Sequence, residues 1–234
     1  MNTPHDHIFR GLDEEQQRVH DGIVRMGEMA AAQLEAALDV VARRDDRASA
    51  RVVANDDAID ALEQEVTQEA VRLALRGPLA RDLRFILAAL RIAAAIERMG
   101  DYAANIAKRS AALSMAPPLP QVEALQALGR RAVDLIRQAT RAYRDEDADL
   151  AIQARDADAR IDADYSELYR DLVEYMGNDP RSITSATHLM FMAKNIERIG
   201  DHATNVAENV CYLVSGEDDL PPREKRDDSP SLAP

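Results

Sequence analysis

A twelve-residue segment occurs twice in this chain, and it constrains the fold more than any other feature. Residues 96–107 read IERMGDYAANIA, and 100 positions later residues 196–207 read IERIGDHATNVA. Eight of the twelve positions are identical and the alignment has no gap, whereas two unrelated segments would share about one. The chain is therefore predicted to contain two similar units.

Four of the eight residues that both copies keep are polar, namely Glu, Arg, Asp and Asn, whereas a repeat that served only packing would be expected to let its polar residues drift. On a helix, the Glu and Asp of each copy lie one turn apart, and the Asn continues the same ridge, nearly opposite the apolar stripe. The motif carboxylates are therefore expected to face outward, away from the core of their own bundle. Two carboxylates at this spacing can bind one oxygen-preferring cation, and an amide oxygen is a further hard ligand. The predicted metal ligands are Glu97, Asp101, Asn105, Glu197, Asp201 and Asn205.

Two carboxylates are too few to hold a metal ion, so a neighbouring helix must contribute. Asp56, Asp60 and Glu63 form an acidic ridge in the preceding segment. In the second unit Asp158 and Asp162 take the matching places, and Tyr165 replaces Glu63. Asp60 and Asp162 are thus further candidate ligands. The alternative is that these acids are only solvated, because the flanks of amphipathic helices are commonly acidic.

Apolar residues recur at threes and fours along six segments, as amphipathic helices require. The predicted helices cover about 12–44, 46–76, 79–113, 122–144, 148–176 and 181–214. Gly77-Pro78 and the proline-rich run 117–120 are predicted breaks, and no segment shows sustained strand alternation. The expected fold is all-α, with two tandem three-helix bundles over 1–117 and 118–215. Residues 216–234 are rich in Pro and charge and are predicted to be a disordered tail.

Composition restricts the partners and the cellular location. The chain has 42 acidic and 29 basic residues, a formal charge of −13, which repels phosphate backbones and argues against nucleic-acid binding. A single cysteine, Cys211, excludes an internal disulfide and fits a reducing cytoplasm. No signal peptide is evident, and the most apolar run, 85–96, is shorter than the ~20 residues of a membrane span. A cytoplasmic protein is expected.

The third predicted helix is apolar on two faces. Besides its core stripe it carries Leu83, Leu87, Leu90 and Ala94 on the face of Glu97. A helix with two apolar faces is usually buried on both, so this face is expected to meet the other bundle or a second subunit, and a homodimer is predicted. The alternative is a modest exposed patch.

Two three-helix units that each carry Glu-Arg-x-Gly-Asp-x-x-x-Asn resemble the PhoU family of phosphate-uptake regulators. Residues 76–84, RGPLARDLR, look like the family's Arg-Gln-Pro-x-x-x-Asp-Leu-Arg start of the third helix, with Gly77 in place of Gln. The second unit reads SIT at 182–184 and lacks this signature. The resemblance implies Glu97, Asp101, Glu197 and Asp201 as ligands of divalent or iron ions, which family members bind in multinuclear clusters.

The resemblance also implies a non-enzymatic role. Family members are negative regulators that link the ATPase subunit of a phosphate ABC transporter to a sensor histidine kinase, so association with the membrane would occur only through these partners. One alternative is a carboxylate-bridged dinuclear metal enzyme, although Gly100 and Gly200 stand where a ferritin-like Glu-x-x-His pair needs histidine. Another is a helical scaffold without metal.

Overall fold

The computed structural model describes residues 4–76, 80–114, 117–216 and 220, without the side chains of 4–12, 46 and 80. The described residues contain no strand, and the all-α prediction is confirmed. The helices are α1 (Pro4–Arg43), α2 (Asp46–Leu75), α3 (Ala80–Ser114), α4 (Val122–Arg144), α5 (Ala148–Asn178), the short 3-10 helix η1 (Pro180–Ser182) and α6 (Ile183–Ser215).

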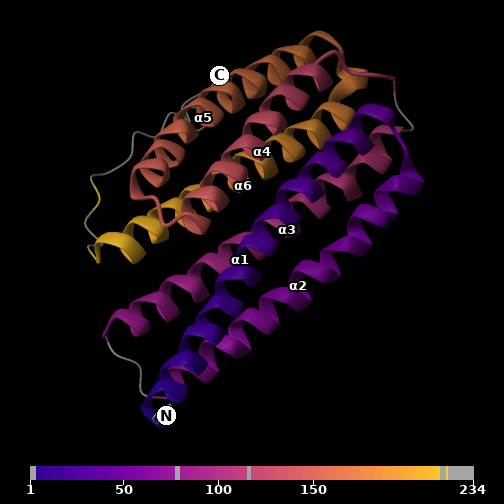
Figure 1. Cartoon of the computed structure of the whole chain (residues 1–234). Helices are drawn as coiled ribbons and strands as arrows, with labels where there is room; N and C mark the ends of the chain where they lie inside the picture. The colour runs from indigo at the N-terminus through magenta and orange to yellow at the C-terminus, as the bar shows by residue number, and fades with distance from the viewer. Residues whose placement is uncertain (1–3, 77–79, 115–116, 217–219, 221–234) are drawn as a thin grey trace.

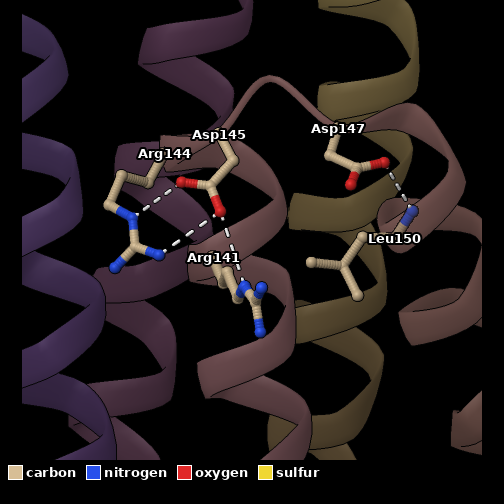
Figure 2. A network of polar contacts seen from close by, with 5 residues as sticks. All are labelled: Arg141, Arg144, Asp145, Asp147 and Leu150. Carbon is tan, nitrogen blue, oxygen red and sulfur yellow. Dashed lines mark hydrogen bonds and ion pairs between the residues drawn. The ribbon is translucent and has the colours of Figure 1, made fainter.

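Aspartates at the turns determine where helices begin. The Asp45 carboxylate accepts hydrogen bonds of 3.0 Å from the backbone N–H groups of Arg47 and Ala48 at the start of α2, and Asp147 accepts one of 2.9 Å from Leu150 at the start of α5. These bonds satisfy N–H groups that the first turn of a helix leaves without partners. Figure 2 shows the α4–α5 turn, where Asp145 is held by Arg141 and Arg144.

Two boundaries differ from the sequence prediction. Helix α1 begins at Pro4 and not near residue 12, because proline suits the first turn of a helix and an interior glycine such as Gly11 costs only about 1 kcal/mol. The short helix η1 was not predicted; Asp179 caps it by accepting a 3.1 Å hydrogen bond from the Arg181 N–H. The predicted break at Gly77-Pro78 and most of the predicted tail lie outside the described residues.

The helices form two adjacent three-helix bundles, α1–α3 and α4–α6 (Figure 1). Each bundle packs aliphatic side chains in its interior, such as Ile92 and Leu125, which are fully buried. The bundles meet through α1 against α4 and α3 against α6, while in the described residues α2 and α5 contact only elements of their own bundle. The two helices that carry the repeated segment therefore lie at the interface.

Equivalent positions of the two halves contact each other across this interface. A Cβ atom at Gly27 would collide with Thr140, and one at Gly129 would collide with Leu38. Gly129 stands 102 residues after Gly27, and Thr140 stands 102 residues after Leu38. The two contacts therefore join equivalent positions of the two halves. The bundles are thus related by an approximate two-fold axis, as in an isologous interface.

The repeated segments cross near this axis. The rings of Tyr102 and His202, which occupy the same position of the repeat, lie with centroids 5.6 Å apart. On either side, the Arg91 guanidinium lies 5.7 Å from the Tyr212 ring and the Arg109 guanidinium 4.4 Å from the Phe191 ring. Residue numbers rise along α3 as they fall along α6, so the two helices pack antiparallel. No described helix is long and apolar enough to cross a membrane.

Candidate metal centre

The glycine of the repeated segment brings the acidic ridge of the preceding helix against the motif. A Cβ at Gly100 would lie 3.0 Å from Ile59 Cδ1 and 3.1 Å from Asp56 Oδ1. At Gly200 it would lie 2.5 Å from Asp158 Oδ1, closer than real Cβ atoms approach. The glycine between Glu and Asp is therefore explained by the close approach of α2 to α3 and of α5 to α6.

A buried glutamine that the sequence reasoning missed holds the first of these contacts. Gln33 of α1 donates to Asp56 Oδ1 at 2.8 Å and to the Gly100 carbonyl at 3.1 Å. It is only 6% exposed. The available signal was an amide within the apolar stripe of the first helix, between Ala30 and Leu34, where a polar group needs a partner.

The carboxylates of the first half act on one another as a single cluster. Burial raises the pKa of Asp60, and the charges of Asp101, Asp57 and Glu63 raise it further. Burial likewise raises the pKa of Glu97, with Asp101, Asp60 and Glu63 adding to the effect and Arg98 opposing it. Like charges that raise one another's pKa favour either a proton or a cation between them.

Asp56 belongs to the same cluster. Burial raises its pKa; the hydrogen bond from Gln33 opposes this effect, and the charges of Asp101 and Asp60 add to it. The acids of the neighbouring helix thus lie within electrostatic range of the motif acids, and the first-half cluster is defined as Asp56, Asp60, Glu63, Glu97 and Asp101.

A groove beside this cluster is completed by the other half of the chain. It has a volume of about 620 Å³ and is lined by Glu63 of α2, by Glu97 of α3 and by His202, Asn205 and Asn209 of α6, among others. The sequence reasoning grouped Asn205 with Glu197, but the structure places Asn205 in the groove of Glu97. Burial lowers the pKa of His202, with Arg98 and Arg198 adding to the effect and Asp201 opposing it.

The second half is more enclosed. The Glu197 side chain is 6% exposed, whereas that of Glu97 is 25% exposed and that of Asp101 is 38% exposed. Asp158 and Asp162 are buried as well. The helical wheel had predicted that all the motif carboxylates face outward; this is wrong for Glu197, which forms an ion pair with Lys194 at 2.8 Å.

The donor set of the first half fits a hard cation. All five side chains offer carboxylate oxygens, which Mg²⁺, Mn²⁺ and iron accept. Asp60 Oδ1 is shielded from solvent and accepts no hydrogen bond, and an oxygen in that state is costly unless a cation or a proton reaches it. In the described residues no three His, Cys, Asp or Glu side chains are already arranged as a metal-binding group.

The second apolar face of α3 is not covered by the other bundle. Leu83 is 46% exposed and Leu87 is 39% exposed, so the prediction that this face meets the other bundle is wrong at these two positions. The bundles meet on the side of α3 that carries Arg84, Arg91 and Tyr102, which lie near Gly216, Tyr212 and His202. A second subunit on this face remains a prediction.

Comparison with known proteins identifies the family. The family model described as PhoU domain matches this chain twice, at residues 23–110 and 125–210. The chain belongs to the PhoU family. The two matches correspond to the two three-helix units and confirm the tandem repeat that the duplicated segment predicted.

PhoU relatives resemble the chain over nearly its whole length. A phosphate-specific transport system accessory protein PhoU homolog of Xylella fastidiosa (strain 9a5c) is 57% identical over 233 residues, which cover 99% of each chain. The protein of the same name from Caulobacter vibrioides (strain NA1000 / CB15N) is 38% identical over 95% of this chain and 97% of that protein.

Solved PhoU structures share the fold. The crystal structure of PhoU from Pseudomonas aeruginosa superposes with a TM-score of 0.85 at 32% identity, covering 88% of this chain and 99% of the other. The phosphate transport system regulatory protein PhoU from Streptococcus pneumoniae gives a TM-score of 0.82 at 26% identity, covering 88% of this chain and 98% of the other.

Proposed function

We propose that this protein is a metal-binding regulatory adaptor of phosphate uptake. The observation that carries the proposal is a PhoU-family chain in which both copies of the motif lie against an acidic ridge. Its relatives are named as accessory proteins of a phosphate-specific transport system. In this role the protein restrains the phosphate-starvation response by coupling the ATPase subunit of a phosphate ABC transporter to a sensor histidine kinase.

The proposed metal ligands are the carboxylates of the two motifs, Glu97 with Asp101 and Glu197 with Asp201. Asp60 and Asp162 contribute from the neighbouring helices, and the amides of Asn105 and Asn205 are proposed as further ligands. A bound divalent or iron ion would neutralise the gathered negative charge and fix the relative positions of the helices that supply its ligands. No catalytic step is required for this role.

Regulation is favoured over catalysis because the relatives are named as accessory proteins of a transport system and not as enzymes. A dinuclear enzyme remains the second candidate, since several carboxylates meet beside a groove. The adaptor and enzyme functions can be distinguished with purified, metal-loaded protein. An adaptor binds the transporter ATPase or the kinase without turning over substrate. Turnover that disappears in Glu97→Ala would favour the enzyme.

The regulatory role is tested by deletion and complementation in the source organism. The deletion strain should express phosphate-starvation genes at high phosphate, and the wild-type gene should restore repression. The double variant Glu97→Ala/Asp101→Ala should fail to restore it, whereas Glu65→Gln, an exposed acid on α2, should restore it. Unchanged phosphate-regulated expression in the deletion strain would contradict the proposal.

The partners are tested by a pull-down from cells grown at high and low phosphate, followed by metal analysis of the recovered protein. We expect the transporter ATPase or the sensor kinase in the bound fraction. The protein itself is proposed to be cytoplasmic and to reach the membrane only through these partners. A homodimer is also proposed, and its test is the mass in solution measured by light scattering.

A further inference from the structure

The two halves differ in the side chains that surround the motif glutamate. In the second half Lys194 places its Nζ 2.8 Å from Glu197 Oε2 and 5.0 Å from the ring centre of Tyr165. The first half has Ala94 at the position of Lys194 and Glu63 at the position of Tyr165. An ammonium and an aromatic face therefore replace a methyl group and a carboxylate.

This exchange changes the charge of the two clusters. The first half gathers five carboxylates, and the second half has four with one ammonium among them. The Glu197 side chain is 6% exposed, and a carboxylate that has lost its water needs a close counter-ion. Lys194 supplies that charge from within the chain, and the Tyr165 ring stabilises the ammonium further.

Among the residues that the structure describes, the first half has no partly buried cation equivalent to Lys194 beside Glu97. Arg98 contacts Glu97 Oε2 at 3.4 Å, but the arginine side chain is 56% exposed, and ion pairs in contact with solvent are weak. Lys108, which lowers the pKa of Asp56, is also exposed. Solvent and ions can therefore exchange at the first half more readily than at the second.

We propose that the Lys194 ammonium is a built-in counter-ion that competes with metal in the second half, so that the first half fills at a lower metal concentration. The inference rests on the proposed function, because it presumes that the acidic clusters bind metal. A divalent cation that enters the second half must first displace Lys194 from Glu197 and from the face of Tyr165. In the first half the metal has to displace only Arg98 from Glu97 and Asp101, and this costs less because the arginine is in contact with solvent.

The test is a titration of the purified full-length chain with Mn²⁺ alone, by equilibrium dialysis with metal analysis. In the wild type, uptake at low Mn²⁺ should be lost in Glu97→Ala/Asp101→Ala and kept in Glu197→Ala/Asp201→Ala. Lys194→Ala gives the second half the alanine that the first half has at position 94. It should strengthen Mn²⁺ binding to the second half, the uptake that occurs at higher Mn²⁺, by about tenfold or more. That gain should require Glu197 and Asp201.

The reciprocal variant Ala94→Lys carries the ammonium into the first half. Ala94 is exposed, so the variant should fold, and its uptake at low Mn²⁺ should weaken by less than the gain in Lys194→Ala, because ion pairs in contact with solvent are weak. Lys194→Arg keeps a cation in place and should retain the wild-type order of filling. If Lys194→Ala is poorly folded without metal, Mn²⁺ should raise its melting temperature more than that of the wild type.

The outcomes separate the inference from the proposed function. Equal filling of both halves in the wild type, or no change in either swap variant, would overturn the inference while leaving metal binding intact. An absence of Mn²⁺ uptake by the wild type and by every variant would overturn both. A second half that fills first would also overturn the inference, because it would show that Lys194 does not compete.

Discussion

The carboxylates of the first half make the metal-free protein sensitive to pH. Burial and like charges raise the pKa values of Asp56, Asp60 and Glu97, so the folded state binds more protons than the unfolded state between the ordinary carboxyl pKa, about 4, and the raised values. Across that window the free energy of unfolding contributed by this cluster falls as pH rises. The stabilisation is fully present below the window and lost above it.

Neutralising Asp60 should therefore stabilise the metal-free protein at neutral pH while weakening metal binding. Asp60→Asn should raise the free energy of unfolding at pH 7.5 by about 0.5 kcal/mol, a small amount because the cluster is in contact with solvent. It should also have less effect at pH 4. Urea unfolding at both pH values, with Glu65→Gln as the control, measures this. Destabilisation at pH 7.5 would contradict this prediction, because it would show that the charged Asp60 carboxylate stabilises the metal-free protein.

Gln33 should be important for stability although it carries no charge. Gln33→Leu removes the donor to Asp56 Oδ1 and to the Gly100 carbonyl, which should lower the free energy of unfolding by about 1–3 kcal/mol. Gln17→Leu is the control, because Gln17 donates to Asp21 at an exposed position, and its effect should stay within about 0.5 kcal/mol. Equal changes in the free energy of unfolding for the two variants would show that the hydrogen bonds of Gln33 do not stabilise the protein.

At the scale of the helices, the motif glycine determines how closely its neighbour packs. Gly200→Ala would place Cβ 2.5 Å from Asp158 Oδ1 and should cost about 1–3 kcal/mol by overpacking. Gly177 in α5 has no atom within 4 Å of an added Cβ, so Gly177→Ala should stabilise the protein by about 0.5–1 kcal/mol. Thermal unfolding of both variants is the measurement, and effects of the same sign would contradict the close approach.

Much of the helical architecture could be predicted from local chemistry. Aspartates at turns, proline in first turns and apolar periodicity act over a few residues, and this is why the start of α4 and the α4–α5 turn were predicted closely. The predicted start of α1 near residue 12 is wrong, because a proline in the first turn and one interior glycine, here Pro4 and Gly11, are compatible with a long helix.

The candidate site could be predicted only in part. The motif acids and the facing ridge were found because both repeat in the sequence. The place of Asn205 beside Glu97 was missed, because it depends on how α6 crosses α3. The burial of Glu197 was missed for a similar reason: Tyr165 of α5 lies against Lys194, which pairs with Glu197 within α6. Periodicity describes each helix alone and carries no information about such crossings.

At the scale of the whole molecule, the two halves pack like a dimer within one chain. The paired contacts of Gly27 with Thr140 and of Gly129 with Leu38 hold α1 against α4, and the same approximate symmetry brings Asn205 into the groove of Glu97. Any change that separates α1 from α4 should therefore also disturb the groove that both halves line.

The contact between α1 and α4 can be measured with a double-mutant cycle. Gly27→Ala should destabilise the protein by about 1–3 kcal/mol, because the new Cβ meets the Thr140 side chain. Thr140→Ala removes the colliding atoms and should restore most of that loss in the double variant. Urea unfolding of the four proteins gives the interaction energy. Additive effects would show that the two residues do not face each other.

The central claim is that the acids gathered by the motif glycine hold a metal ion. It is tested most directly by a crystal structure of the full-length protein grown with Mn²⁺ and measured for anomalous scattering. We expect an anomalous peak bound by the carboxylates of Glu97, Asp101 and Asp60. No peak at this cluster in crystals where Mn²⁺ binds elsewhere would contradict the account.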